Sequence, residues 1–536
     1  MEATQMLGIP VLVLFLFFIF FNKNARHSVA CGMMIMMRRR RAAYGPRSFP
    51  LVGSLFSFWK NATRHTEWYT ELLAKSPTQT IVVERLGGIK TVVTANPANV
   101  EHILKTRFEN YPKGKPFTTI LHDLLGRGIF NSDGDAWKLQ RKVASHEFNT
   151  RSLRNFVVDV VEEATGRLLS ILGDQAAGRG RSRSLDMQDI LQRFAFDNIC
   201  KVAFGIETGS LDASLPPSEL GHAMDVASRL SSMRSADPVQ LVWKVKRMLN
   251  LGSERRLAEA VGVVHDFAAD VIRRRRSEMT AAMAAADENP KQDLLSRFML
   301  SVANIEGVDR PEEFLRDIII SFILAGRDTT SSAMVWFFWL LSSHPHVEDA
   351  IYDEVTSLIQ AREGGVKKTS GSGGFSFSYE ELQKMRYLHA AICESMRLYP
   401  PVVVDSKHAL QDDVLPDETP VRRGTRVTYH PYAMGRMESI WGSDCLEFKP
   451  ERWLDERGSF VHQSPFKYAV FQGGMRVCLG RDMAFIQMKY IAASVILSFR
   501  LRPVGRGVRP KLVHCLTARM AGGFPVLVER KSMPES

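Results

Sequence analysis

Hydrophobic residues recur with the period of an α-helix along most of the chain, and only short segments alternate as strands do. Between Thr80 and Thr94, two β-branched runs flank Gly87 and Gly88, a pattern that predicts a β-hairpin. Amphipathic patterns predict helices at residues 100–107, 135–148, 153–172, 187–204, 255–283, 311–343, 347–360, 380–398 and 483–499. The chain is therefore predicted to be mainly α with small β-sheets, and no internal boundary divides its body.

The N-terminal segment carries a strongly hydrophobic run. Residues 6–21 contain no charged side chain, and basic residues follow, including four consecutive arginines at 38–41. The run is slightly shorter than the ~20 residues that span a bilayer comfortably, and Pro10 lies inside it. A cleaved signal peptide would carry positive charge before the run, but only Glu2 and the α-amino group precede it, so an uncleaved anchor is favoured. The charge asymmetry then predicts that the body lies in the cytosol.

The predicted organisation follows from this anchor. A membrane anchor over residues 1–26 is followed by a basic, proline-rich connector over 27–55. One large domain extends over residues 56–530, and a short tail covers 531–536.

Composition and charge narrow the class of protein. The 536 residues are 45% hydrophobic and 24% charged, which is typical of a globular protein with a large core. The net charge of +12 favours acidic partners such as an anionic membrane surface. Nucleic acid is not an expected partner, because the sequence contains no zinc-finger spacing and no heptad array behind a basic region. The six cysteines are too scattered for a disulfide framework, which favours a reducing compartment.

Candidate chemistry concentrates around Cys478. Glycines before and after it let backbone N–H groups approach its sulfur, and a helix predicted just beyond adds its positive end, so both favour a thiolate. Arg476 offers a cation suited to a carboxylate. The pattern F-x-x-G-x-R-x-C-x-G is matched at Phe471, Gly474, Arg476, Cys478 and Gly480. This pattern resembles the haem-binding loop of the cytochrome P450 superfamily, although Met475 stands where proline is usual.

A second motif supports the resemblance. Glu394 and Arg397 match the family's E-x-x-R on a helix, where positions i and i+3 share a face and can form a buried ion pair. The later segment P-E-R-W resembles the one whose arginine, here Arg452, completes that network behind the haem. The two segments precede Cys478 in the family's order and spacing, so a chance match does not explain them.

A third motif, W-x-x-x-R, matches at Trp137 and Arg141. The spacing puts both side chains on one helical face. In the family this helix approaches the haem propionates. The resemblance therefore implies that Arg141 and Arg476 neutralise propionate charge and that Trp137 donates a hydrogen bond.

The predicted helix at 311–343 is interrupted by the polar sequence AGRDTT at 325–330. It is not expected to span a membrane, since a charged residue near the bilayer centre costs about 2.5–3.5 kcal/mol on insertion scales. In isolation, Gly326 could end one helix while Asp328 or Thr329 caps the next. The sequence also resembles the family's A-G-x-D-T-T oxygen-binding turn. That resemblance implies that Ala325 and Gly326 lie beside the haem, that Gly326 leaves room over the iron, and that Asp328 and Thr329 relay protons.

The resemblance implies the P450 fold, a single large helical haem domain behind the anchor. It also implies haem b with Cys478 as thiolate ligand, and activation of O₂. Electrons would come from NADPH through NADPH–cytochrome P450 reductase, with the protein held in the endoplasmic reticulum membrane by one span. Residues expected to contribute to a basic docking surface are Lys138, Lys142, Arg481 and Lys489.

Longer segments most resemble the plant fatty-acid ω-hydroxylase group, at residues 126–148, 404–416, 427–442 and 448–456. Oxidation of a chain end requires a channel that presents only the tip of the chain. Apolar candidates for its wall, which might equally be core residues, are Phe117 to Leu121, Phe322, Ala325, Val402 and Val404. A fatty acid is the first expected substrate. Jasmonoyl-amino acid conjugates and the C-26 end of sterol or steroidal-sapogenin side chains are alternatives.

Two other classes of function remain open at this point. A haem-thiolate isomerase or dehydratase of hydroperoxides would need no external electrons, but the intact Asp328-Thr329 pair disfavours it. A membrane-anchored lipid-binding protein would explain the channel and the anchor, but not the cysteine loop.

Overall fold

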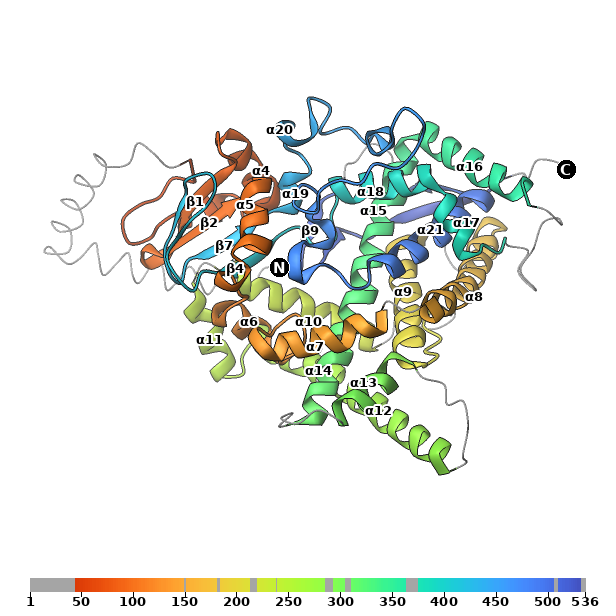
Figure 1. The fold of residues 1–536 in the computed structure, drawn as a ribbon, viewed down its shortest axis with the longest axis horizontal. Coiled ribbons are helices and arrows are strands. Elements are labelled where there is room, and N and C mark those ends of the chain that lie inside the picture. Colours follow the sequence, from red (N-terminus) through yellow and green to blue (C-terminus); the bar gives the residue numbers. More distant parts are fainter. Residues whose placement is uncertain are drawn as a thin grey trace, which may run out of the picture.

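The predicted mixture of helices and short strands is present in the computed structural model of the chain (Figure 1). The structure describes residues 44–148, 151–180, 184–212, 219–237, 239–284, 293–303, 310–362, 375–505 and 510–531. The predicted anchor, most of the connector and nearly all of the tail lie outside the described residues. Within the described part, helices predominate and the strands form four small sheets.

Most predicted helices begin and end within a few residues of their expected positions. The prediction for 187–204 matches α9 (Met187–Phe204), which Asp186 caps and which ends at left-handed Gly205. The helix expected at 380–398 is two helices, because Met385 between them is not helical. The described helices are α3 (Leu55–Lys60), α4 (His65–Lys75), α5 (Pro97–Glu101), α6 (Lys115–Leu125), α7 (Gly134–Phe148), α8 (Arg151–Ala176), α9, α10 (Glu219–Ala236), α11 (Gln240–Met248), α12 (Ser253–Ala284), α13 (Leu294–Ala303), α14 (Pro311–Ile323), α15 (Thr329–Ser343), α16 (Pro345–Gln360), α17 (Tyr379–Lys384), α18 (Arg386–Leu398), α19 (Pro431–Met434), α20 (Glu438–Trp441) and α21 (Arg481–Ser498).

The predicted hairpin forms one edge of a four-stranded sheet at one end of the molecule (Figure 1). Strands β1 (Thr80–Glu84) and β2 (Lys90–Thr94) are antiparallel, as expected. Two strands from the C-terminal half complete the order β1-β2-β7-β4: β7 (Arg426–Tyr429) runs parallel to β2, and β4 (Asp405–His408) is antiparallel to β7. The smaller sheets contain β3 (Leu185–Asp186), β8 (Phe499–Pro503) and β11 (Pro525–Arg530), then β9 (Leu512–His514) and β10 (Ala518–Met520), then β5 (Asp413–Val414) and β6 (Pro420–Val421).

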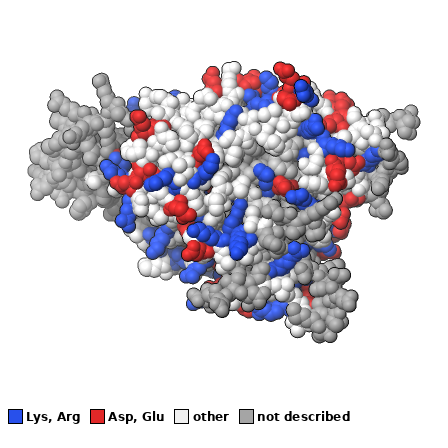
Figure 2. Space-filling model, viewed as in Figure 1, with Lys and Arg blue, Asp and Glu red and all other residues white. Residues whose placement is uncertain are grey.

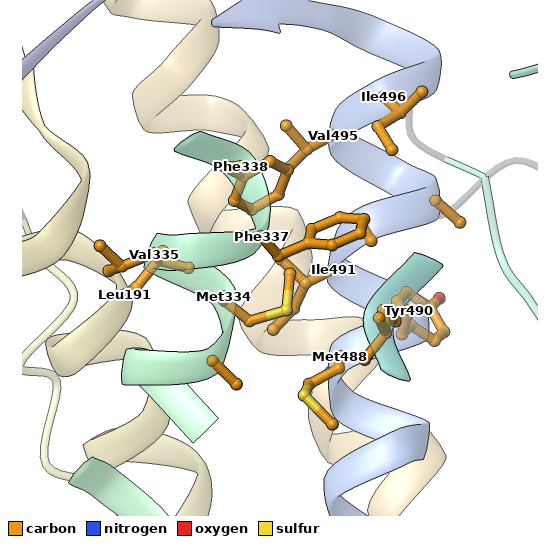
Figure 3. Close-up of a cluster of buried hydrophobic side chains, with 14 of the residues drawn as sticks. Leu191, Met334, Val335, Phe337, Phe338, Met488, Tyr490, Ile491, Val495 and Ile496 are labelled. Atoms are coloured by element: carbon orange, nitrogen blue, oxygen red, sulfur yellow. The ribbon is translucent and has the colours of Figure 1, made fainter. Parts of the chain in front are cut away.

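The helical core surrounds α15. Its side chains Met334, Val335, Phe337 and Phe338 lie between α9 and α21 (Figure 3). Helix Pro311–Ser343 is the only helix of the described chain that is long and apolar enough to cross a membrane, and 83% of its most apolar window is buried inside the protein. It is therefore a core helix, in agreement with the expectation from its charges.

The AGRDTT segment changes the winding of this helix without breaking it. A π-helical turn, η4 (Leu324–Asp328), joins α14 to α15, and the residues on both sides stay helical. Asp328 makes no side-chain capping bond, so the alternative of two separate helices is wrong. Wide turns of this kind often occur at functional sites.

Gly326 in the π-helical turn allows close packing against α9. A Cβ at this position would lie 2.6 Å from two side-chain carbons of Ile199, a separation that real Cβ atoms essentially never show. The Cβ direction at residue 326 therefore points at Ile199. The expectation that this glycine leaves room over an iron atom stays a prediction.

We expect Gly326→Ala to lower the free energy of unfolding by about 1–3 kcal/mol, because overpacking forces the two helices apart. Gly262→Ala is the matched control, since this helical glycine on α12 has open space around it. That variant should be neutral or up to about 1 kcal/mol more stable. Denaturant unfolding of both variants measures the difference, and equal stability would contradict the assigned packing role.

Candidate active site

The cysteine motif forms a tight, irregular turn before α21. The 3₁₀ segments η6 (Ala469–Phe471) and η7 (Gly474–Arg476) lead into it, and the Cys478 N–H donates to the Phe471 carbonyl at 2.8 Å. Gly474 has a φ of +60°, and a Cβ there would collide with the Leu104 carbonyl. Only glycine fits at this position, which explains its place in the motif.

Cys478 differs from the other described cysteines, because it is exposed whereas they are buried. Protein atoms still surround the sulfur closely enough that burial raises the pKa of the thiol, and the Gly480 N–H and the Arg141 charge oppose this rise. The Gly480 N–H thus favours the thiolate, as predicted, but burial outweighs its effect on the pKa. A metal ion at the sulfur would supply the missing positive charge, since a coordinating thiol is deprotonated outright.

Helix α7 brings the W-x-x-x-R motif against this turn. The Arg476 guanidinium lies 4.4 Å from the centroid of the buried Trp137 ring, and Arg476 Nη2 donates to Asp133 Oδ1 at 2.8 Å. Arg141, one helical turn after Trp137, donates to the Val477 carbonyl. Arg476 Nε is buried and has no hydrogen-bond partner among the described residues. Three motif residues are thus gathered at the cysteine, with one cationic donor still free.

A buried polar cluster beside the turn was not predicted. Asp405 Oδ1 accepts from Lys113 Nζ at 2.6 Å, and Asp405 Oδ2 accepts from Lys407 Nζ at 3.0 Å and Tyr429 Oη at 2.9 Å. The Tyr429 hydroxyl is also hydrogen-bonded to the side-chain amide of Gln472 in the cysteine turn. Although burial opposes the charge, the two lysines hold the pKa of Asp405 below its usual range. Burial also lowers the pKa of the Lys407 ammonium well below its usual range, although Asp405 opposes this. The cluster ties β4 and β7 to the cysteine turn through Tyr429 and Gln472.

The E-x-x-R motif forms a fully buried network. Arg397 donates through Nε and Nη2 to the two oxygens of Glu394, both at 2.7 Å. Arg452 Nε and Trp453 Nε1 donate to the same carboxylate at 3.3 and 2.9 Å. Arg452 also reaches Asp444 at 2.8 Å. The network joins α18 to the segment 444–453 that precedes the cysteine turn.

The π-helical turn presents a polar notch in an otherwise apolar helix. Thr329 Oγ1 donates to the Ala325 carbonyl at 2.6 Å, the back-bonding expected of a helix threonine. Ala325, Gly326 and Thr329 are only partly buried, whereas the residues around them are buried. Part of the surface of these three residues is therefore not covered by other protein atoms.

Asp328 lies beside this notch in an ion-pair cluster. Arg327 Nη1 donates to Asp328 Oδ1 at 2.6 Å and to Asp225 Oδ1 at 2.8 Å, and Arg519 also pairs with Asp225. Burial raises the pKa of Asp328, although Arg327 and Arg519 oppose the rise. Asp328 Oδ2 is buried without a hydrogen-bond partner, so it is free to hold a proton.

The predicted channel residues differ in their surroundings. Phe322 packs edge-on against Phe148 and Phe298, with ring centroids 5.8 and 5.5 Å away, which makes it a core residue. Val402 and Val404 are partly buried on either side of the buried Val403. Phe117 is partly buried on α6, under the Lys113 ammonium at 4.5 Å. The interpretation of Phe322 as channel wall is therefore not supported, and the others stay predictions.

One of the four residues predicted for the basic docking surface, Lys489, does not lie at the surface. Lys489 is buried and donates to the Leu382 carbonyl at 2.7 Å, and burial lowers its pKa to about 8. The pattern misplaced it because α21 is buried on nearly every side. Lys138, Lys142 and Arg481 are exposed. On the face shown in Figure 2, basic and acidic side chains are interspersed rather than gathered in a single-sign patch.

Comparison with known proteins identifies the family. A family model described as Cytochrome P450 matches residues 44–518. The chain is 50% identical over 498 residues to Cytochrome P450 94B1 of Arabidopsis thaliana, covering 92% of each chain. It is 48% identical over 493 residues to Cytochrome P450 94A2 of Vicia sativa, covering 91% of each. Cytochrome P450 CYP94D108 of Paris polyphylla is 47% identical over 499 residues, covering 92% of this chain and 94% of that one.

The fold agrees with these matches. The solved structure of the cytochrome P450DA heme domain superposes with a TM-score of 0.71 over 91% of this chain and 98% of that one. At 20% identity this likeness supports the fold alone. The protein is a haem-thiolate monooxygenase. The chain belongs to the cytochrome P450 family, and the three plant relatives named above are P450 94 enzymes.

The described residues fit a haem with cysteine ligation. Cys478 offers a single accessible sulfur, and no group of three or more His, Cys, Asp or Glu side chains in the described chain offers an alternative metal site. Arg476 has a buried donor without a partner, and Arg141 adds positive charge beside the sulfur. This charge complements an anionic group such as a carboxylate pair.

We expect Glu394→Gln to lower the free energy of unfolding by about 3–5 kcal/mol, because it leaves Arg397 and Arg452 facing a neutral amide in a buried site. The variant should also retain less haem, measured as absorbance per milligram. Glu71→Gln is the control, since Glu71 pairs with Arg64 at the surface and is 49% exposed. Its cost should not exceed about 1 kcal/mol. If Glu394→Gln unfolds at the same denaturant concentration as the wild type, the network is dispensable for stability.

Proposed function

We propose that the protein hydroxylates the terminal carbon of an aliphatic chain, that of a fatty acid, with O₂ and electrons derived from NADPH. The observation that carries the proposal is the π-helical notch at Ala325 and Thr329 within a dry, apolar helix. A terminal methyl group is harder to oxidise than an internal methylene, so selectivity must come from positioning. One polar notch in a helix whose other buried positions are mostly apolar supports the proposal.

The chain's own residues would divide the work as follows. Bound haem supplies oxygen activation, which a thiolate ligand promotes. Cys478 would hold the iron, and Arg141, Arg476 and Trp137 would hold the propionates. Glu394, Arg397 and Arg452 would fix the segment behind the cofactor. These roles rest on the contacts described for each residue.

Proton supply would come from the Asp328 side of the notch. Asp328 has one free buried oxygen and a raised pKa, so its carboxyl can hold a proton at higher pH than an exposed aspartate. Arg327 links it to Asp225, whose side chain is 28% exposed and meets solvent. Thr329 would pass the proton onward from its hydroxyl at the notch.

The remaining parts of the proposal concern partners and location. We infer one membrane span near residues 1–26 that holds the domain on the cytosolic face of the endoplasmic reticulum. Electrons would arrive through NADPH–cytochrome P450 reductase, at a surface that includes Lys138, Lys142 and Arg481. Residues 56–530 would form the catalytic domain behind the connector 27–55.

The substrate class is tested by product analysis in microsomes that contain the reductase. Fatty acids, jasmonoyl-isoleucine and hydroxylated sterols are each supplied with NADPH, and we expect a terminal alcohol from a fatty acid. Terminal oxidation of only a jasmonoyl conjugate or a sterol side chain would select that alternative. Absence of terminal products from all three would end the ω-hydroxylase proposal. Turnover without NADPH would indicate an isomerase instead.

We expect Thr329→Ala to keep its haem but to form about tenfold less product per NADPH consumed, because the relay hydroxyl is lost. The carbon monoxide difference spectrum checks haem, and parallel NADPH and product assays check coupling. Ser331→Ala is the control: its hydroxyl makes the same bond to a carbonyl four residues earlier, that of Arg327, but away from the notch. Unchanged coupling in Thr329→Ala would remove its assigned role.

A further inference from the structure

Two arginines without carboxylate partners lie on one face of the four-stranded sheet. Arg426 begins β7, and its strand partner on β2 is Thr91, which in turn pairs with Val83 of β1. Arg85 follows β1, two residues after Val83, and its N–H continues the hairpin by donating to the Ile89 carbonyl at 2.7 Å. Because side chains alternate along strands, Arg85 and Arg426 share a face.

Neither arginine forms an ion pair with any described residue. Arg85 Nε is buried and has no hydrogen-bond partner, and its guanidinium contacts only the Phe58 ring, 5.8 Å from the centroid. Arg426 donates only to hydroxyl groups, Ser406 Oγ at 3.0 Å and Ser235 Oγ at 3.3 Å. Both side chains are partly buried, and arginines in such positions commonly meet a carboxylate or phosphate, so this pair lacks a counter-charge among the described residues.

The two charges act on each other. Burial, and then the charge of Arg85, lowers the pKa of Arg426 to about 10. Burial raises the pKa of Tyr69, and the charges of both arginines oppose this rise. Burial and, to a smaller extent, the charge of Arg85 lower the pKa of His65. Asp405 is the one carboxylate that acts on Arg426. It already accepts from two lysines on the opposite face.

The surroundings suit an amphipathic ligand. Ser235 lies at the end of α10, so Arg426 faces that helix rather than the cysteine turn. Next to Arg85, Leu51 and Ile89 are 60% and 64% exposed, and the Leu51 carbonyl accepts from the Gly87 N–H at 3.0 Å. A charged site bordered by exposed apolar side chains fits a molecule with an anionic head and a hydrocarbon chain.

We propose that Arg85 and Arg426 bind the carboxylate of an aliphatic substrate and thereby fix which end of the chain reaches the Cys478 side of the molecule. This inference rests on the proposed function and deepens it, since it assigns the substrate an anionic end. A haem propionate has the same chemistry and is the other possible source of a carboxylate. The alternation of β4 and β7 favours the substrate, because the residues that reach the cysteine turn lie on the other face.

The test compares an acid with its uncharged ester. Dodecanoic acid and methyl dodecanoate are titrated into full-length wild-type protein, Arg85→Gln and Arg426→Gln, and binding is followed by the shift of the haem spectrum. We expect the dissociation constant for the acid to rise about tenfold in each variant, because a charge-assisted hydrogen bond is lost. The ester should bind all three proteins alike. Arg422→Gln is the control, since its side chain is 82% exposed on the same β6–β7 connection.

The other outcomes either overturn the carboxylate site or separate it from the proposed function. Equal weakening of acid and ester, or no change in either variant, overturns the proposal. Loss of haem from both variants overturns it as well, because the anion would then be a propionate. Arg85 lies after the end of β1 and outside the strand ladder, so Arg85→Gln keeps the test valid if Arg426→Gln fails to fold. If acid binding weakens as expected while products are not terminal alcohols, the carboxylate site stands and the ω-hydroxylase proposal fails.

Discussion

The chemistry depends on holding one irregular loop still. Residues 471–480 have no strand ladder, and few backbone bonds, among them Cys478 N–H to the Phe471 carbonyl, hold their shape. Distant side chains also define it: Arg141 binds the Val477 carbonyl, Tyr429 binds Gln472, and Asp133 binds Arg476. A sulfur ligand is useful only if its position is fixed, because small displacements of a reacting group slow the reaction strongly.

Buried charge is the means by which this positioning is achieved. Glu394 and Arg397 are both fully buried, and such a pair adds little net stability compared with an apolar core. Breaking it is costly, however, because an unpaired charge would remain. The pair therefore admits very few arrangements of α18 and the segment 444–453. The same argument applies to Asp405 and Lys113, which join the strand β4 to the segment before α6.

The sequence predicted those features whose signal lies within a few residues. The hairpin, most long helices and the F-x-x-G-x-R-x-C-x-G loop are local patterns, and they are present in the structure. The Asp405–Lys113 contact joins residues 292 positions apart, and no local pattern marks it. Helix α10 was missed because serine and alanine dilute its apolar stripe. Lys489 was misjudged because a helix buried on nearly all sides has no polar face on which a lysine can be placed.

The period of a strand explains how one small sheet can serve two purposes. On β4 and β7, Asp405 and Lys407 pair with Tyr429 and Val427, and this face is tied through Gln472 to the cysteine turn. The intervening Ser406 pairs with Thr428 and binds Arg426, which faces α10. A shift of one residue in this register would exchange the two faces and move every charge to the wrong side. Strand register therefore keeps the positive charge beside the cysteine separate from the positive charge of Arg85 and Arg426.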